Sequence, residues 1–207
     1  MNAIITGASR GIGRACAETL SAAGFRVTAV ARNEAQLREL QHTHPTVEPL
    51  VADLTREVPT GVYDVVILNA GYYAPGGLLD PGRDVFGESW ELNVMANHRL
   101  ARALLPPLVE RGHGHLVVIG SSATDDTSGH MTAYGATKKC LRILYESWER
   151  ELEGSGVRTT LVAPGATLTS SWAGETPPPK ILQPTAVADL VLRCVNEGIT
   201  GRVTIKA

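Results

Sequence analysis

Short apolar runs alternate along the chain with longer stretches in which apolar residues recur at helical spacing. Apolar runs of this length are typical of strands buried on both faces of a parallel sheet. They predict strands at 3–6, 26–30, 47–51, 64–68, 115–120, 157–163 and 202–206. The intervening stretches predict helices at 11–23, 34–41, 132–153 and 185–197, and one over much of 84–110 that ends near Pro106–Pro107 or Gly112. This alternation predicts an α/β fold: a doubly wound parallel sheet of about seven strands with helices on both faces.

Within the first predicted helix, Ile12, Cys16 and Leu20 share one face, and Gly24 follows at the position where helices commonly end. Residues 166–183, rich in Thr, Ser and Pro, predict an irregular loop. No internal repeat or linker interrupts the pattern, so 207 residues are expected to form a single domain, residues 1–207, with its own core.

Composition and charge exclude several classes of protein. The net charge is −2 and the charged residues are scattered, so we expect no basic face for nucleic acid. No uninterrupted apolar run approaches the roughly 18 residues of a membrane span. The chain begins with a strand and a Gly-rich segment rather than a cationic leader, and we therefore expect a cytoplasmic protein.

Cysteine and histidine spacing gives no metal site. Cys16, Cys140 and Cys194 are far apart and odd in number, which favours free thiols in the core or on helix faces. His113 and His115 could suggest a metal pair, but without a third ligand nearby we interpret them as a solvated turn.

A Gly-rich segment, ITGASRGIG, links the first strand to the first helix. There Gly7 permits a tight turn, Gly11 lets a ligand approach bare backbone, and Gly13 allows the helix to pack closely on the strand. The free N–H groups and the positive end of the helix dipole then face an anion above the sheet. Turns alone can require glycine, but the strand–turn–helix context favours dinucleotide binding.

The G-x-x-x-G-x-G spacing of TGASRGIG resembles the short-chain dehydrogenase/reductase family, and further motifs follow in that family's order over nearly the whole chain. They are Asp53 after the third strand, NAG at Asn69, Ala70 and Gly71, Asn93, Ser121, YGATK with Tyr134 and Lys138, and Pro164–Gly165 followed by Thr169. Ser121 precedes Tyr134 by 13 residues, the usual interval in the family. Several motifs in the correct order are far more specific than any one alone.

The resemblance implies a Rossmann fold and a nicotinamide cofactor, with Asp53 contacting the adenine. The residues that it implies for the cofactor are Gly7, Ser9, Arg10, Gly11, Ile12, Gly13, Arg32, Asp53, Leu54, Asn69, Ala70, Gly71, Tyr134, Lys138, Pro164, Gly165, Thr167 and Thr169. The chain departs from the family at Leu68, where many members carry a second Asn. It is also short between Asp53 and Asp64, where the usual helix does not fit, and in the loop 166–183. We therefore expect an open site with a small lid or none.

The second strand ends without a carboxylate that could bond the ribose hydroxyls of NAD. Ala31 is neutral, Arg32 follows it, and Arg10 lies inside the Gly-rich turn. Two guanidinium groups can bind a 2′-phosphate through charge-assisted hydrogen bonds, which favours NADP(H). The alternative is that both are solvated surface arginines.

Tyr134 and Lys138 are four residues apart on a predicted helix and so share one face. An ammonium group near the phenol favours the phenolate and would lower its pKa toward neutrality. By resemblance, Lys138 also bonds the nicotinamide ribose, Ser121 holds the substrate oxygen, and Asn93 steadies a water that connects Lys138 to solvent. Each motif alone has a structural explanation: Tyr-x-x-x-Lys occurs by chance on helices, and Ser121 or Asn93 could serve a turn or a helix.

The sequence thus predicts an NADP(H)-dependent oxidoreductase that interconverts a ketone or aldehyde and an alcohol, with Tyr134 as acid/base. The alternatives are a non-catalytic NADP(H) sensor and a structural module without cofactor affinity. We expect the stretch 122–133 and the substrate loop 166–183 to shape the pocket, with His130 a candidate to line it and Trp172 covering substrate or packing the loop. By resemblance, the partners are a small-molecule carbonyl or alcohol and a second copy, in a homodimer or homotetramer formed through helices 84–110 and 132–153.

Overall fold

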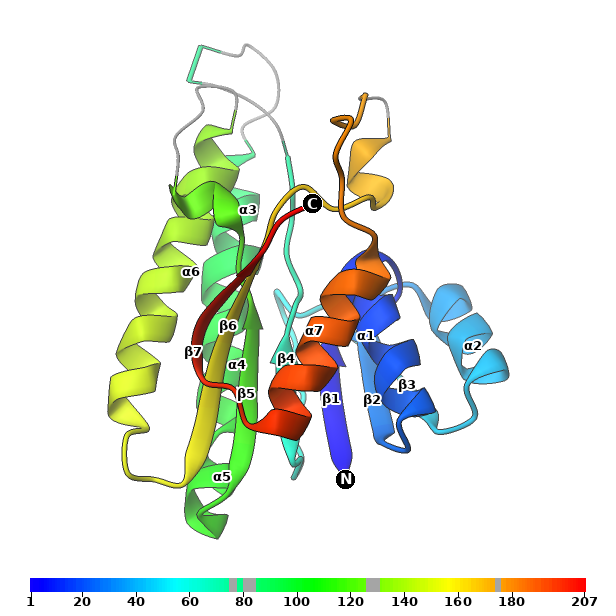
Figure 1. Ribbon diagram of the computed structural model, residues 1–207, viewed down its shortest axis with the longest axis vertical. Coiled ribbons are helices and arrows are strands. Elements are labelled where there is room, and N and C mark those ends of the chain that lie inside the picture. Colours follow the sequence, from blue (N-terminus) through cyan, green and yellow to red (C-terminus); the bar gives the residue numbers. More distant parts are fainter. Residues whose placement is uncertain (75–77, 80–84, 126–130, 174–175) are drawn as a thin grey trace.

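The computed structural model describes all residues except 75–77, 80–84, 126–130 and 174–175. Its centre is a seven-stranded sheet with the order β3-β2-β1-β4-β5-β6-β7, in which every neighbouring pair is parallel (Figure 1). The strands are β1 (Asn2–Thr6), β2 (Arg26–Ala31), β3 (Val47–Val51), β4 (Val65–Leu68), β5 (Gly114–Ile119), β6 (Val157–Pro164) and β7 (Gly201–Ile205). The predicted doubly wound parallel sheet is confirmed, and each strand lies within one residue of its predicted bounds.

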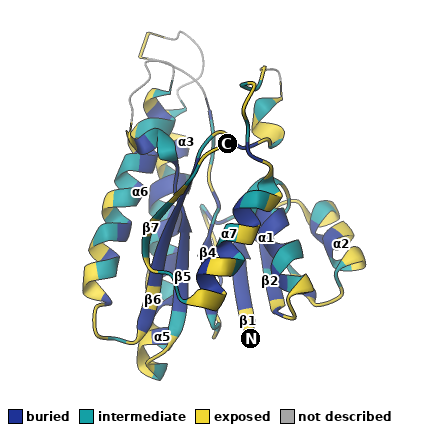
Figure 2. Ribbon diagram, viewed as in Figure 1, coloured by how far each residue is buried: buried dark blue, intermediate teal, exposed yellow. Residues whose placement is uncertain are grey.

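Helices cover both faces of the sheet. They are α1 (Gly11–Ala22), α2 (Glu34–Thr43), α3 (Phe86–Trp90), α4 (Asn97–Leu104), α5 (Pro106–Arg111), α6 (Thr132–Glu151) and α7 (Pro184–Glu197), with a π-helical turn η1 (Glu91–Ala96) and short 3₁₀ turns η2 (Ser122–Asp125) and η3 (Ser170–Trp172). Figure 2 shows buried and exposed residues alternating along α6 and α7, as expected when apolar residues at helical spacing place one side of a helix against the sheet.

Alternate side chains of each strand enter two separate apolar clusters. Ile5, Ile67 and Val117 pack with α1, α2 and α7 on one face. Ile4 and Val66 pack with α4, α5 and α6 on the other. Because successive side chains of a strand point to opposite faces, strands covered on both sides must be apolar at nearly every position. The run in β4, where all four residues are buried, follows from this.

The helix predicted over 84–110 is divided in the structure. The π-helical turn η1 joins α3 to α4, and a new helix, α5, begins at Pro106. Proline has no N–H to donate, so it fits the first turn of α5 better than the interior of one long helix. Gly112, in the left-handed region at φ 69°, ends α5 as expected. Residue 84 lies outside the described residues.

The solvated turn predicted for His113 and His115 is wrong for His115. His113 is exposed, but His115 is fully buried in β5 and its Nε2 lies 2.7 Å from Thr160 Oγ1 on β6. The free thiols agree with expectation: Cys16 and Cys194 are buried and Cys140 is half-buried. In the described part of the chain no group of His, Cys, Asp and Glu could hold a metal, and no helix there could cross a bilayer.

Candidate active site

Every predicted site residue in the described part of the chain follows or ends a strand at the carboxyl edge of the sheet, or lies on a helix that packs there. The strand order reverses between β1 and β4, since β1 connects outward to β2 while β4 continues toward β5. Open parallel sheets bind ligands at the carboxyl edge where this reversal occurs, because the adjoining loops diverge and leave a crevice. The Gly-rich turn after β1 and the NAG segment after β4 flank this point.

Backbone geometry explains the three glycines of the turn. Gly7 and Gly11 have φ of 68° and 57°, a region that favours glycine. Gly13 is required for space, because a Cβ there would lie 2.3 Å from the Gly7 carbonyl oxygen. The N-terminus of α1 begins after Arg10 with no side-chain cap and no acidic residue in its first turn. Its N–H groups are therefore available to an anion.

Thr6 and Asn69 join the turn to the end of β4. The Thr6 hydroxyl oxygen accepts from the backbone N–H groups of Asn69 and Ala70, each at 3.0 Å. The Asn69 amide nitrogen donates to the carbonyl oxygens of Thr6 at 2.9 Å and Gly7 at 3.2 Å. Asn69 thus uses its donors within the protein and leaves its side-chain oxygen for any ligand, so its first role is to hold the two loops together.

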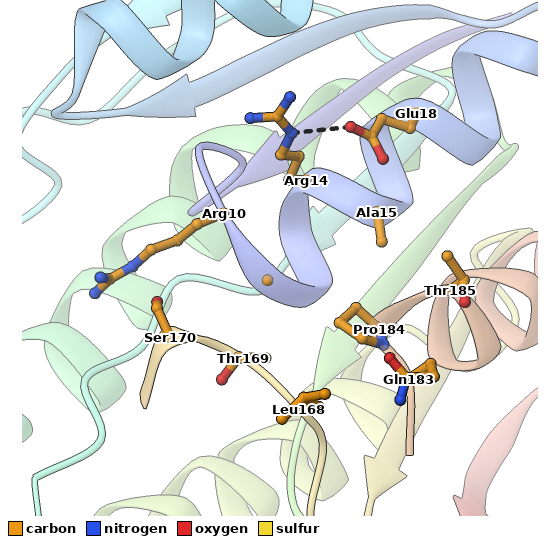
Figure 3. Close-up of a pocket in the computed structure, with 11 residues that line it drawn as sticks. Arg10, Arg14, Ala15, Glu18, Leu168, Thr169, Ser170, Gln183, Pro184 and Thr185 are labelled. Atoms are coloured by element: carbon orange, nitrogen blue, oxygen red, sulfur yellow. Dashed lines mark hydrogen bonds and ion pairs between the residues drawn. The ribbon is translucent and has the colours of Figure 1, made fainter. Parts of the chain in front are cut away.

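Arginines near the turn differ in whether they are paired. Arg14 bonds Glu18 and Glu39, each at 2.9 Å. Within the described ranges, Arg10 and Arg32 are exposed and form no ion pair or side-chain hydrogen bond. Figure 3 shows the Arg10 side chain extending away from the Arg14–Glu18 pair. Two of the arginines at this edge are therefore available to a phosphate.

A cavity of about 450 Å³ lies between the start of α1, residues 168–170 and the start of α7 (Figure 3). The Gly-rich turn approaches the 168–170 segment closely, since a Cβ on Gly11 would lie 3.1 Å from the Thr169 methyl carbon. Any side chain at position 11 would therefore crowd the passage between the turn and the loop.

Asp53 lies after β3 with both charge and local hydrogen bonds around it. One carboxylate oxygen accepts from Thr55 N at 3.1 Å and from the Thr55 hydroxyl at 2.8 Å. These bonds, followed by the positive charges of Arg32 and Arg56, hold the pKa of Asp53 below its usual value. Leu54 next to it is buried in the core, so only its backbone could reach a ligand. Residues 53–64 contain no helix, in agreement with the sequence.

Backbone hydrogen bonds join the two ends of the loop that follows β6. Thr167 pairs with Leu182 in an isolated bridge, and Leu168 N donates to Leu182 O at 2.8 Å. The Trp172 indole donates to Thr167 O at 2.9 Å. Its side chain therefore stabilises the loop by binding another residue of the same loop. Thr167, predicted as a cofactor residue, is buried, and its hydroxyl donates a hydrogen bond to Gly165 O at 2.9 Å. Pro164 and Gly165 pair with Ile205 of β7, so the loop begins from a fixed strand end.

The structure brings Ser121, Tyr134 and Lys138 close together. Ser121, after β5, is hydrogen-bonded through its side chain to Tyr134 on α6, and its Oγ accepts from Ala123 N at 3.1 Å. Lys138 is buried, its Nζ lies 6.0 Å from the centre of the Tyr134 ring, and it donates to Ile119 O at 3.0 Å. A serine hydroxyl, a phenol and an amine thus share one small space beside the NAG segment.

The titration of Tyr134 differs from the sequence-based prediction. Burial raises its pKa, the Ser121 hydrogen bond lowers it, and the nearby Tyr73 raises it again. Lys138 does not reverse this, because its ammonium group is directed to the Ile119 carbonyl rather than to the phenol oxygen. Burial also lowers the pKa of Lys138 to about 8. Its amine can therefore exchange a proton close to neutral pH.

Asn93 lies in the π-helical turn η1, fully buried, and ties three segments together. Its Oδ1 accepts from Tyr72 N at 2.6 Å, and its Nδ2 donates to Tyr72 O and to Thr137 Oγ1, each at 3.0 Å. Both amide donors are used, so a water at this residue would have to donate to an oxygen. A Cβ on Gly71 would lie 3.2 Å from Asn93 Oδ1 and 3.5 Å from Lys138 Nζ, so the glycine keeps the space between them open.

Sequence reasoning missed several residues of this site. The Tyr73 ring contacts the Tyr134 ring, Thr137 Oγ1 accepts a hydrogen bond from the Asn93 amide, and Arg56 adds positive charge near Asp53. Thr137 lies 44 positions from Asn93, and Tyr73 lies far from Tyr134 in the sequence, so no local spacing could have indicated these contacts. His130, proposed to line the pocket, lies outside the described residues.

The family model described as short chain dehydrogenase matches residues 1–179, most of the chain. The chain belongs to this family. An uncharacterized short-chain type dehydrogenase/reductase of Sinorhizobium fredii is 34% identical over 170 residues, covering 79% of this chain and 68% of that protein. An uncharacterized oxidoreductase of Staphylococcus aureus is 29% identical over 209 residues, covering 94% of this chain and 90% of that protein.

Solved structures of the same family superpose over nearly the whole chain. A short-chain dehydrogenase from Sphingobium yanoikuyae in complex with NADPH has a TM-score of 0.88 and 30% identity, covering 98% of this chain and 87% of that one. A short-chain dehydrogenase/reductase family oxidoreductase from Burkholderia thailandensis has a TM-score of 0.86 and 26% identity, covering 99% and 91%. The family assignment and the Rossmann-type fold predicted from the sequence are thereby confirmed.

Proposed function

We propose that this short-chain dehydrogenase family member is an NADP(H)-dependent oxidoreductase that interconverts a ketone or aldehyde and an alcohol. The observation that carries the proposal is the grouping of Ser121, Tyr134 and Lys138 beside an uncapped, Gly-rich helix N-terminus at one sheet edge. A protein that only sensed the cofactor would not need a buried amine and two hydroxyl groups in contact next to it.

The residues have distinct roles in this proposal. Ser121 holds the carbonyl oxygen of the substrate: its Oγ accepts from Ala123 N, and its hydroxyl hydrogen, shared with Tyr134 in this structure, would be donated to that oxygen. Tyr134 transfers a proton to or from that oxygen. Lys138, with its pKa near 8, restores the proton of the phenol from the direction of Gly71 and Asn93. The bound nicotinamide would supply or accept the hydride.

The preference for NADP(H) rests on charge at the adenosine end. Arg10 and Arg32 are exposed and unpaired in the described ranges, and Arg56 lies close enough to act on Asp53. A 2′-phosphate carries negative charge that these guanidinium groups can bind. The relative from Sphingobium yanoikuyae, solved with NADPH, is consistent with this preference. We also propose that the loop 166–183 borders the substrate and that the protein forms a homodimer or homotetramer through α6 and the helices within 84–110, which are α3, α4 and α5.

The proposal is tested by following NADPH consumption with a panel of ketones and aldehydes. Tyr134→Phe is expected to lower turnover by a factor on the order of 10²–10⁴, the usual contribution of a general acid, while the dissociation constant of NADPH stays within about twofold of wild type. Near wild-type turnover by the variant would contradict the role of Tyr134. No turnover by wild type with tight NADPH binding would favour the sensor, and no NADPH binding would favour a structural module. NADH binding more tightly than NADPH would contradict the phosphate assignment.

A further inference from the structure

Two tyrosine rings meet at the candidate active site. Tyr73 and Tyr134 have ring centroids 5.1 Å apart and planes at 73°, an edge-on arrangement typical of favourable aromatic pairs. Tyr73 is half-buried and lies two residues beyond the NAG segment. It therefore reaches the proposed general acid from the β4 side of the crevice, while Ser121 reaches it from β5.

The backbone that carries Tyr73 is held against α6. Asn93 bonds both the N–H and the carbonyl of Tyr72, at 2.6 and 3.0 Å. The same amide donates to Thr137, whose hydroxyl donates to the carbonyl oxygens of Ala133 and Tyr134. Ala74, next in the chain, is 5% exposed. Segment 72–74 and the first turns of α6 are thus fixed relative to each other, so the ring contact is built into the fold.

Three polar side chains lie around the Tyr134 phenol. Ser121 is hydrogen-bonded to it, Tyr73 lies at its ring, and Lys138 Nζ, 6.0 Å from the ring centre, is bonded to Ile119 O instead. Ser121 fixes only the oxygen of Tyr134. The amine does not constrain the ring. Among these groups, Tyr73 alone presents a rigid surface against it.

We propose that Tyr73 is a positioning residue, whose ring restricts rotation of the Tyr134 ring and keeps the phenol oxygen directed at Ser121 and the substrate carbonyl. The inference rests on the proposed function, because it assigns a role within that reaction. A small displacement of a proton donor lowers the rate while leaving binding intact. The oxygen of Tyr73 also acts on the acid: a negative charge there disfavours the Tyr134 phenolate and raises its pKa.

Two substitutions separate these effects. Tyr73→Phe keeps the ring and removes the hydroxyl, so we expect kcat within about twofold of wild type. Tyr73→Leu keeps apolar bulk but removes the ring, so we expect kcat to fall about tenfold with the KM for NADPH unchanged. Tyr63→Leu, at the opposite edge of the sheet, removes a half-buried tyrosine as a control and leaves both measures unchanged.

A second measurement does not depend on turnover. The ultraviolet absorbance of tyrosinate is titrated in wild type and Tyr73→Phe, each compared with the same protein carrying Tyr134→Phe, so that the difference isolates Tyr134. We expect Tyr134 to titrate at lower pH without the Tyr73 hydroxyl. Turnover of Tyr73→Leu equal to wild type, or an unchanged titration, overturns the inference alone. If wild type reduces no substrate, the proposed function fails, and the titration still decides whether the two rings are coupled.

Discussion

The Gly-rich turn after β1 and the cluster of Tyr73, Ser121, Tyr134 and Lys138 lie on the same sheet edge but are held by different contacts. The turn is shaped by backbone: two positive φ angles and one close approach at Gly13. The cluster is held by side chains, since Asn93 binds Tyr72 and Thr137, and Lys138 binds Ile119. The shape of the turn itself is set by neighbours in the sequence, although Thr6 and Asn69 join it to β4. The cluster consists of residues that only folding brings together.

The distribution of buried polar side chains shows the same contrast. Among the described residues, Thr6 is the only buried polar side chain before residue 89. The others follow it in the chain: Ser89, Asn93, Asn97, His115, Ser121, Thr124, Thr137, Lys138, Thr159, Thr160 and Thr167. A buried polar group costs free energy unless it is hydrogen-bonded, so the second half depends on partners being held in place. Substitutions in the two regions should therefore impair different properties of the protein: NADPH binding in the turn and turnover in the cluster.

Gly13→Ala should have the largest effect, and it should act on the cofactor. The added Cβ would lie 2.3 Å from Gly7 O and 2.4 Å from Asn69 Nδ2, so α1 must shift away from the turn. We expect the free energy of unfolding to fall by about 1–3 kcal/mol and the Kd of NADPH to rise at least about tenfold. Thermal unfolding and a fluorescence titration with NADPH measure the two effects.

The matched control for this substitution is Gly87→Ala on α3, where a Cβ would meet nothing within 4 Å. Alanine is the better helix former, so this variant should be as stable as wild type or more so by up to about 1 kcal/mol. NADPH affinity in Gly13→Ala equal to that of the control would show that the turn tolerates the methyl group.

Asn93→Ala should produce the opposite pattern, with turnover affected more than cofactor binding. It leaves Tyr72 N without its acceptor and removes the hydrogen bond donated to Thr137 Oγ1, which costs about 1–3 kcal/mol of unfolding free energy. Because the Tyr72–Tyr73 segment and α6 lose their connection, kcat should fall about tenfold or more, with the Kd of NADPH changed less than about threefold. Asn196→Ala, on the exposed side of α7, is the surface control. Equal losses in NADPH affinity and in turnover would mean that Asn93 stabilises the whole carboxyl edge of the sheet rather than the catalytic residues alone.

His115 should make stability depend on pH, with the smallest effect. The Thr160 hydroxyl donates to Ile199 O, so it accepts from His115 Nε2, and His115 Nδ1 is buried with no partner among the described residues. Burial, followed by the charge of Arg158, lowers the pKa of His115 to about 4. Its neutral form therefore stabilises the fold above the unfolded pKa near 6.5, and this contribution is lost as pH falls toward 4.

Between about pH 7 and pH 5.5 wild type should lose about 1 kcal/mol more unfolding free energy than His115→Gln, whose amide can still donate to Thr160 but cannot titrate. Urea unfolding at the two pH values measures the difference. His113→Gln is the exposed control and should behave as wild type. A pH dependence that is the same in wild type and His115→Gln would mean that His115 is already solvated in the folded state.

Much of this molecule was predictable because it depends on residues close in sequence. The β4 run is buried at every position, so its apolar pattern alone indicated an interior strand. Gly7, Gly11 and Gly13 act within one turn, and their spacing was sufficient to predict its shape. Tyr134 and Lys138 share a helix face because they are four residues apart. The burial of His115, the π-helical turn at Asn93 and the contact of Tyr73 with Tyr134 all depend on distant partners.

The sequence by itself therefore determined the layers of the fold, the Gly-rich turn and the kinds of side chain at the carboxyl edge, since periodicity and local backbone geometry specify them. Only the tertiary structure decided which of those side chains are in contact, where the Lys138 amine is directed and which way the pKa of Tyr134 shifts. Burial and hydrogen-bond partners set these properties, and both are supplied by segments that become neighbours only when the chain is folded.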